Sequence, residues 1–564
     1  MSENLYVECL DCGYQEDYCP NEFYCPKCNG KWRIARYGEN PALGKKLLER
    51  IQHRPFDLWR YIELLPIKER PDISMSEGGT PLHHAKDLGM MLGLKNLYIK
   101  DERQNPTNSF KDRQAVITMS ALQKEGINEA VLASTGNVAI SYAAYSSRAS
   151  IKLWAFLPSL VPVEKMREVA IYGTQVIKVT ASYDQTKAVA AQFAKQQTGS
   201  LYLEKGTQSV PTLEAMKTVG FEIAEQLAEK LPKEGAATPW RTPDWYFQAL
   251  SGGVGAVGVM KGYRELRRMG LVDSVPKIAG IQSAGCAPMV HAWKNNQDVA
   301  DPVLKPYTKI ATLATGDPGR TYTLLRKWML EERGGTFESA TDEEAFRAMH
   351  VLAEMEGMSM EPASAVAFAG LIKMTRAGLI DPDEVIVVNC TGHTLPTEKI
   401  ILDKQWAHSV KLPAPNEDNA KTSTKYPEDG ILSALSRVTP DKYSHIAIVD
   451  DHPHARRLIR RILQSQGEYT FYEAKNGEEA IQIAQEKQPD LMILDLMMPK
   501  QDGFSVLDQL CARPETASIP VIVVTAKELT AQEKNHLQGR IHSLLQKGDF
   551  MDDELLGEVK SLTK

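Results

Sequence analysis

Four short apolar runs near the end of this 564-residue chain constrain its fold more than any other feature. Each run is shorter than a typical helix, and each is followed by a polar residue. The runs are residues 446–449, 491–494, 521–524 and 541–546. Strands that are apolar along their whole length are typical of parallel sheets covered by helices on both faces. Residues 444–564 are therefore predicted to form a doubly wound, flavodoxin-like α/β domain.

Polar side chains follow these runs directly. Asp450 and Asp451 follow the first run, Asp495 the second, Thr525 the third and Lys547 the fourth. Parallel strands end at one shared edge, so these side chains should lie together. Three neighbouring carboxylates repel one another, and their hard oxygen atoms suit Mg²⁺. The three aspartates are therefore predicted magnesium ligands. Asp495 is the predicted phosphoryl acceptor, Lys547 neutralises the phosphoryl charge, and Thr525 offers a hydroxyl.

This segment resembles a response-regulator receiver domain. Met497-Met498-Pro499 and Asp502-Gly503 match the loop that follows the phosphorylated aspartate in that family. The resemblance implies phosphorylation of Asp495 by a sensor histidine kinase or a phosphotransfer protein, with Thr525 and Lys547 as switch residues. One departure is Leu544, which stands where the family usually has an aromatic switch residue.

The first 35 residues hold a cysteine cluster, since five of the eight cysteines lie within residues 1–28. Cys9 and Cys12 form one C-x-x-C pair, and Cys25 and Cys28 form another. Each pair can place two thiolates on one tight turn, and four thiolates complete the tetrahedral shell of structural Zn²⁺. Residues 1–35 are therefore predicted to be a zinc ribbon. The alternative is a degenerate ribbon whose cysteines are merely reduced surface thiols.

A single lysine, Lys111, stands between a short polar loop (residues 105–110) and an amphipathic helical pattern. A lysine at a helix start is commonly just a surface residue, but other parts of a cofactor site recur downstream. Residues 251–258 form a Gly-rich turn between a strand-like run and a helical pattern, where backbone N–H groups and the helix dipole favour a phosphate. The candidate phosphate-binding residues are Gly252, Gly253, Val254 and Gly255.

Two further turns complete the requirements of pyridoxal phosphate (PLP). That cofactor needs a lysine for a Schiff base, phosphate donors, a group facing the pyridine nitrogen and a group near the ring hydroxyl. Asn137 follows a predicted strand and can reach a ring oxygen, and Thr391 follows another and can face the pyridine nitrogen. Burial would lower the pKa of Lys111 enough for Schiff-base formation.

Taken together, these motifs resemble the fold-type II PLP enzymes, and threonine synthase most closely. Residues 77–82, 213–218 and 356–365 add matches, and the resemblance covers most of residues 1–405. It implies a tryptophan synthase β-like fold of two α/β subdomains over residues 36–412, and a homodimer. It also implies Lys111 as the Schiff-base lysine and proton shuttle. A small amino-acid substrate would be held by Thr80, Ser134 and Thr135.

The substrate stays open between alternatives. The resemblance implies the threonine synthase reaction, in which O-phospho-L-homoserine and water give L-threonine and phosphate. However, Val138 stands where the family has a threonine, and residues 208–214 lack the family's arginine, so two groups that help bind the substrate phosphate are missing. The alternatives are β-elimination or β-replacement on a serine-like amino acid, and a non-catalytic amino-acid-sensing module that signals through the receiver.

The linker region, the net charge and the lack of long apolar runs complete the predictions from the sequence. Residues 413–443 read as a linker with one short helix near residues 431–436. The net charge of -6 and the pI near 6.1 give no sign of nucleic-acid or anionic-membrane binding. No run approaches the roughly 18 apolar residues of a membrane span, and no secretory leader is apparent. A cytoplasmic enzyme regulated by its own receiver domain is therefore predicted.

Overall fold

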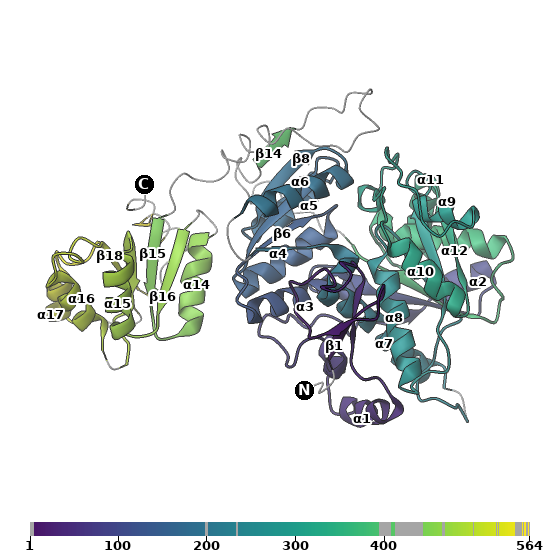
Figure 1. Cartoon of the computed structure of the whole chain (residues 1–564), viewed down its shortest axis with the longest axis horizontal. Helices are drawn as coiled ribbons and strands as arrows, with labels where there is room; N and C mark the ends of the chain where they lie inside the picture. The colour runs from purple at the N-terminus through teal and green to yellow at the C-terminus, as the bar shows by residue number, and fades with distance from the viewer. Residues whose placement is uncertain are drawn as a thin grey trace. The chain divides into compact units, whose positions relative to one another are not determined.

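The chain forms two compact units, Met1–Pro415 and Asn416–Lys564, in the computed structural model (Figure 1). The structure describes residues 5–197, 201–232, 235–393, 408–411, 444–464, 469–499, 501–525, 527, 529–546, 555, 558, 559 and 562. Lys547 and the linker helix expected near residues 431–436 lie outside these described residues. Within them, no helix is both long and apolar enough to cross a membrane.

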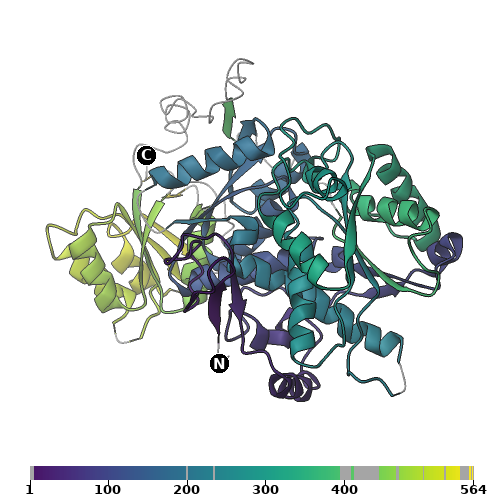
Figure 2. The ribbon, with the colours of Figure 1, turned by 45° about the vertical axis from the view of Figure 1, so that its right-hand side comes forward.

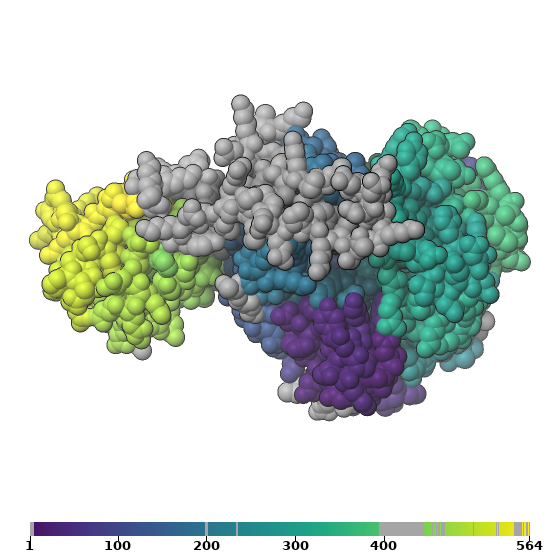
Figure 3. All heavy atoms as spheres, turned by 45° about the horizontal axis from the view of Figure 1, so that its top comes forward, coloured from purple at the N-terminus to yellow at the C-terminus, as the bar shows by residue number. Residues whose placement is uncertain are grey.

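The N-terminal residues form a small antiparallel sheet with the strand order β2-β1-β3. Its strands are β1 (Tyr6–Cys9), β2 (Gln15–Glu16) and β3 (Arg33–Arg36), and helix α1 (Pro41–Ile51) follows. Val7, Trp32 and Ile34 are buried in the same apolar core as residues of the following α/β region. The sheet therefore packs onto the rest of the larger unit instead of standing free, as the purple atoms show (Figure 3).

A five-stranded parallel sheet forms one subdomain of the larger unit. Its strands, in spatial order, are β14 (His408–Lys411), β8 (Gln175–Thr180), β7 (Lys152–Pro158), β6 (Glu129–Ala133) and β9 (Leu201–Leu203). Its helices are α3 (Lys111–Lys124), α4 (Asn137–Ala149), α5 (Val163–Ile171) and α6 (Tyr183–Gln196). Side chains alternate along β7: Leu153 joins the core with α3, α4 and α5, whereas Trp154 contacts Phe193 of α6.

A six-stranded sheet forms the other subdomain, seen from a second direction in Figure 2. Its strands, in spatial order, are β12 (Gly335–Ala340), β11 (Lys277–Ser283), β10 (Trp245–Ala249), β13 (Val385–Cys390), β5 (Asn96–Asp101) and β4 (Leu82–His84). Only β4 runs antiparallel to its neighbour. Val387 of β13 enters one apolar core and Ile386 and Val388 enter another, so both faces of the sheet are buried.

The helices of this subdomain divide between these two cores. The first core contains residues of α7 (Val210–Lys230), α8 (Val254–Arg268), α9 (Pro288–Lys294) and α10 (Thr321–Glu331). The second contains residues of α2 (Lys86–Leu92), α11 (Asp342–Glu356) and α12 (Pro362–Arg376). Short 3₁₀ turns complete the unit at Leu58–Leu64, Glu102–Gln104, Gly206–Gln208 and Ala311–Leu313.

Helix α3 corrects one expectation. The sequence predicts an amphipathic helix after Lys111, but every residue of α3 from Asp112 to Leu122 is buried. The helix packs against both α4 and α7, which leaves no solvent-facing stripe over that stretch. Several of its polar residues instead find partners inside the protein, as Asp112 does with Thr107 and Arg113 with Glu222. The polar positions that mimic an exposed face in the sequence are therefore buried, and several of them are hydrogen-bonded.

The smaller unit contains a five-stranded parallel sheet with the order β16-β15-β17-β18-β19, the predicted doubly wound arrangement. Its strands are β15 (Ser444–Val449), β16 (Tyr469–Ala474), β17 (Leu491–Leu494), β18 (Val521–Thr525) and β19 (Ser543–Gln546). Its helices are α14 (Pro453–Gln464), α15 (Gly477–Lys487), α16 (Gly503–Cys511) and α17 (Ala531–Leu537). Residues of α15 and α16 pack on one face of the sheet, and residues of α14 pack on the other.

Candidate active site and metal sites

The loop before Lys111 pairs with the turn that follows β13. Asn108 adopts the left-handed conformation (φ 59°), as its residue type allows. Its carbonyl accepts a hydrogen bond from the His393 N–H at 2.8 Å, and the Phe110 N–H donates to the Thr391 carbonyl at 3.0 Å. Two motifs far apart in the sequence therefore meet, with Lys111 at the first position of α3.

The Lys111 amine is half-buried, and burial lowers its pKa from 10.5 to about 8. The carboxylates of Glu204 and Glu361 partly oppose this shift. Its Nζ lies 4.2 Å from the centre of the Phe110 ring and has no hydrogen-bond partner among the residues that the structure describes. Near neutral pH, this amine is therefore partly uncharged, which a nucleophilic lysine requires.

The glycine turn (residues 252–255) links β10 to α8 and lies next to the lysine loop. Gly253 has a positive φ of 84°. A Cβ added at Gly255 would lie 2.8 Å from the Phe110 ring, so only a glycine allows this close approach. A Cβ added at Gly252 would meet no atom within 4 Å. Open space at the N-terminus of a 15-residue helix fits a phosphate group.

Two further predicted cofactor residues lie beside the lysine loop. The hydroxyl of Thr391, a residue with only 5% exposure, is 2.8 Å from the Ser364 hydroxyl. A Cβ added at Gly392 would lie 3.2 Å from Nδ2 of Asn137, so this amide borders the lysine loop and the Thr391 turn. The structure therefore brings Lys111, Asn137, Thr391 and the glycine turn into one group. Together they offer the kinds of donor that PLP requires.

The three residues predicted to bind substrate already have partners within the protein. Ser134 Oγ accepts from the backbone N–H groups of Gly136 at 3.0 Å and Ala139 at 3.1 Å, so only its own proton is left to donate. The Thr135 hydroxyl lies 3.4 Å from the Thr312 carbonyl. Thr80 is buried, and its hydroxyl donates to Glu102 at 2.5 Å.

A fully buried set of charges surrounds Thr80. Lys100 and Arg113 both bind Glu222, and Arg113 also binds Glu102 at 2.7 Å. Because all four charged side chains have 0% exposure, they can be stable only as a mutually paired set. Arg113 lies on the first turn of α3, so this set fixes the helix that begins at Lys111.

Glu204, which sequence reasoning missed, follows the short strand β9. Its carboxylate accepts hydrogen bonds from the hydroxyls of Tyr142 and Tyr202, each at 2.8 Å, and from the Gly206 N–H at 2.7 Å. Burial raises its pKa above the usual value for a glutamate, against the effect of those hydrogen bonds. The rule that polar residues at strand ends mark sites would have found it.

Three other residues of the group were also missed. Lys165 of α5 contacts Asn137, and Glu361 contacts both of these residues. Ser364 contacts Thr391. Glu361 and Ser364 lie within the matched stretch 356–365, which was a signal. Nothing in the helical pattern around Lys165 marks that lysine as special.

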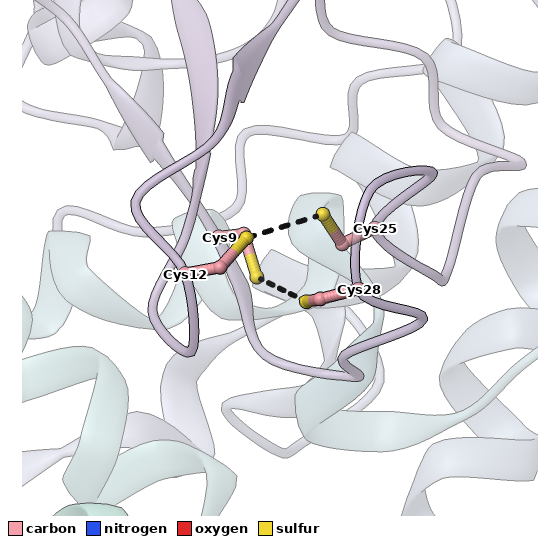
Figure 4. Close-up of side chains that lie close together, drawn as sticks. All are labelled: Cys9, Cys12, Cys25 and Cys28. Carbon is pink, nitrogen blue, oxygen red and sulfur yellow. Dashed lines mark hydrogen bonds between the residues drawn. The ribbon is translucent and has the colours of Figure 1, made fainter.

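The four cysteines converge as predicted for a metal site. Their sulfur atoms lie within 4.8 Å of one another and face inward from two turns (Figure 4). The sulfurs of Cys9 and Cys28 are 3.7 Å apart, as are those of Cys12 and Cys25. Tetrahedral Zn²⁺ with Zn–S bonds of about 2.3 Å would separate its sulfurs by about 3.8 Å. The four thiols therefore fit zinc in geometry.

The receiver aspartates also converge. Carboxylate oxygens of Asp450, Asp451 and Asp495 lie within 4.8 Å of one another at the carboxyl edge of the sheet. One buried oxygen of Asp451 has no hydrogen-bond partner among the described residues, so a cation there would satisfy it. Thr525, at the end of β18, is buried beside the same edge. This arrangement fits Mg²⁺.

Comparison with known families identifies the class of each unit. A model of the "Pyridoxal-phosphate dependent enzyme" family matches residues 73–392, and a "Response regulator receiver domain" model matches residues 446–560. The chain therefore belongs to the pyridoxal-phosphate dependent enzyme family and carries a receiver domain. This confirms the predicted fold class and the predicted PLP enzyme class.

Individual relatives show which members of the family this chain is similar to. The chain is 35% identical to a threonine synthase of Methanocaldococcus jannaschii over 393 residues, covering 69% of this chain and 93% of that protein. It is 32% identical to a threonine synthase of Methanosarcina acetivorans over 399 residues, covering 71% and 94%. A solved structure of threonine deaminase isoform 2 from Solanum lycopersicum aligns with a TM-score of 0.46 at 19% identity, covering 67% and 95%. The enzyme part is therefore threonine synthase-like.

Proposed function

We propose that the chain is a PLP-dependent carbon–oxygen lyase that acts on a small amino acid and carries its cofactor on Lys111. One observation carries this proposal: Lys111 has an amine with a pKa of about 8 and no hydrogen-bond partner among the described residues. Around it lie Asn137, Thr391 and the glycine turn, which come from separate segments of the chain.

Each of these residues would have a defined task. PLP, when bound, withdraws electrons from the α-carbon of an amino acid attached to it. Lys111 would hold the cofactor covalently and, when displaced by substrate, would move protons as a free amine. An amine with a pKa near the working pH suits both tasks. The glycine turn would hold the phosphate, Thr391 would face the pyridine nitrogen, and Asn137 would face the ring hydroxyl.

The threonine synthase reaction is the first candidate, because the 32–35% identical relatives are threonine synthases. In this reaction O-phospho-L-homoserine and water give L-threonine and phosphate. The test incubates the PLP-loaded full-length protein with O-phospho-L-homoserine and measures both phosphate and threonine. Equal amounts of the two products support the reaction, and Lys111→Ala is the control. Absence of both products, with PLP bound, would rule it out.

A β-elimination or β-replacement on an unphosphorylated, serine-like amino acid is the second candidate. Val138 and the absence of an arginine in residues 208–214 favour it, because the resemblance to threonine synthase implies phosphate-binding groups at these places. A phosphate usually requires several charged donors. The test supplies L-serine and measures pyruvate. Binding of serine that changes the cofactor absorbance without any product would instead support the amino-acid-sensing alternative.

We further propose that phosphorylation of Asp495 by a histidine kinase or phosphotransfer protein regulates the enzyme. The support is the co-occurrence in one chain of a receiver domain and a PLP enzyme. The test compares turnover and molecular mass of the wild type and Asp495→Asn, with and without acetyl phosphate. Only the wild type should respond. Identical behaviour of both proteins would contradict regulation, and the masses also test the expected homodimer.

We propose Zn²⁺ for the four thiolates, in a structural role because no ligand position remains open. Mg²⁺ is proposed for the three receiver aspartates. Elemental analysis should find one zinc per chain in the wild type and a loss of zinc in Cys25→Ser. Retention of full zinc in that variant would contradict the assigned ligands.

A further inference from the structure

Three side chains near the lysine loop form a closed ring of hydrogen bonds. Lys165 Nζ donates to Asn137 Oδ1 at 2.6 Å and to Glu361 Oε2 at 2.7 Å. Asn137 Nδ2 donates to Glu361 Oε1 at 2.6 Å. Lys165 and Glu361 are only 5% and 6% exposed, and Asn137 is half-buried.

The ring joins the two subdomains of the larger unit. Asn137 begins α4 and Lys165 lies in α5, and both helices pack on the five-stranded sheet. Glu361 immediately precedes α12, which packs on the six-stranded sheet. The backbone N–H of Glu361 donates to the Gly392 carbonyl at 3.2 Å, so Glu361 is anchored to the Thr391 turn.

The chemistry of the ring allows one orientation of the Asn137 amide. A lysine ammonium group only donates hydrogen bonds, and a carboxylate only accepts them. The oxygen of Asn137 must therefore face Lys165, and its nitrogen must face Glu361. The amide nitrogen carries a second hydrogen, for which the described residues supply no partner. That nitrogen borders Gly392, on the side of the lysine loop.

We infer that Lys165 and Glu361 are positioning residues that fix the Asn137 amide with its free N–H directed at the ring hydroxyl oxygen of the cofactor. The inference rests on the proposed role of Asn137 in PLP binding. Without Lys165, the Asn137 carbonyl loses its donor, and one hydrogen bond to Glu361 is all that still holds the amide. The free N–H is then less firmly directed at the ring hydroxyl oxygen, which weakens cofactor binding and changes the protonation of the cofactor that its absorbance reports.

The test measures the PLP dissociation constant and the pH dependence of the cofactor absorbance for Lys165→Met and Lys165→Arg. Loss of one oriented hydrogen bond should weaken PLP binding about tenfold in Lys165→Met. It should also shift the absorbance profile along the pH axis. Lys165→Arg, which keeps the donors, should restore most of both properties. Lys187→Met, which removes another ion-paired lysine of this subdomain, is the matched control and should leave both unchanged.

A double-mutant cycle with Asn137→Ala shows whether Lys165 acts through Asn137. The effect of Lys165→Met on PLP affinity should disappear when Asn137 is already alanine. An equal loss in both backgrounds, or wild-type affinity and spectrum in Lys165→Met, would overturn the inference. A wild-type protein that binds no PLP would instead overturn the proposed function, so the two failures are distinguishable.

Discussion

Lys100 and Lys111 are the same residue type in neighbouring segments, yet their surroundings differ. Burial lowers the pKa of both amines. Lys100 uses all three of its hydrogens, donating to Thr80 O and Glu222 at 2.7 Å and to Gln226 at 2.9 Å. Lys111 has no such partner among the described residues. A saturated amine stabilises the fold, whereas an amine without partners is available for chemistry.

Glu222, the carboxylate that pairs with Lys100, stays charged although it is buried. Although burial disfavours a charge on Glu222, the nearby Arg113 and Lys100 hold the pKa of this carboxyl at about 2. Glu222 therefore stays ionised at neutral pH. Lys100 and Arg113 thus face a charged carboxylate, whereas Lys111, at the start of α3, has no hydrogen-bonded carboxylate among the described residues.

The largest expected effect is the loss of turnover in Lys111→Ala. Removal of the residue that holds the cofactor and moves protons should lower turnover by at least about 10²–10⁴-fold. The melting temperature of the protein without PLP should not fall, because the amine of Lys111 forms no hydrogen bond or ion pair with a described residue and burial of its charged form is unfavourable. Steady-state turnover and thermal unfolding measure the two properties. If Lys111→Ala kept more than a tenth of the wild-type turnover, Lys111 would not be the lysine that carries out the chemistry.

The next effect is on stability, in Lys100→Met. Removal of one partner from a buried charged set should lower the free energy of unfolding by about 3–5 kcal/mol. Urea unfolding of the full chain measures the change. Lys95→Met is the matched control, because the exposed Lys95–Asp383 pair should contribute little. Equal stability of the two variants would show that the buried Lys100 contributes no more to the fold than the exposed Lys95.

The smallest effect is the pH dependence of cofactor attachment at Lys111. Only the uncharged amine can attach PLP, so reattachment to the cofactor-free protein should speed up as pH rises, with a midpoint of about 8. The unfolded chain keeps this proton up to its ordinary pKa of about 10.5. Lys111 should therefore also add stability as pH rises from about 8 to 10.5. Stopped-flow absorbance gives the rates, and a midpoint near 10.5 would contradict the lowered pKa.

The sequence predicts those parts of the site that depend on local chain geometry. Asn108 marks a left-handed turn, the cysteine pairs mark two turns whose thiols converge, and the aspartates mark strand ends. Each of these signals is carried by a few consecutive residues. The structure places Asn108 and the cysteines as those signals indicate.

What the sequence does not predict depends on contacts between distant segments. Lys165 looks like any helical lysine until α5 places it beside Asn137 and Glu361. Ser134 looks free to bind substrate, but its oxygen accepts from the first turn of α4. The buried polar face of α3 looks like a solvent-exposed face, because burial depends on α4 and α7 packing around it. Tertiary packing decides each case.

The measurement that tests the central claim most directly locates the cofactor on the chain. The PLP-loaded full-length protein is reduced with borohydride, which makes the covalent link permanent, and is then digested and mapped by mass spectrometry. We expect a single modified lysine, Lys111, with Lys100 unmodified. Modification of Lys100, or of any other lysine in place of Lys111, would contradict the assignment of Lys111 as the lysine that carries PLP.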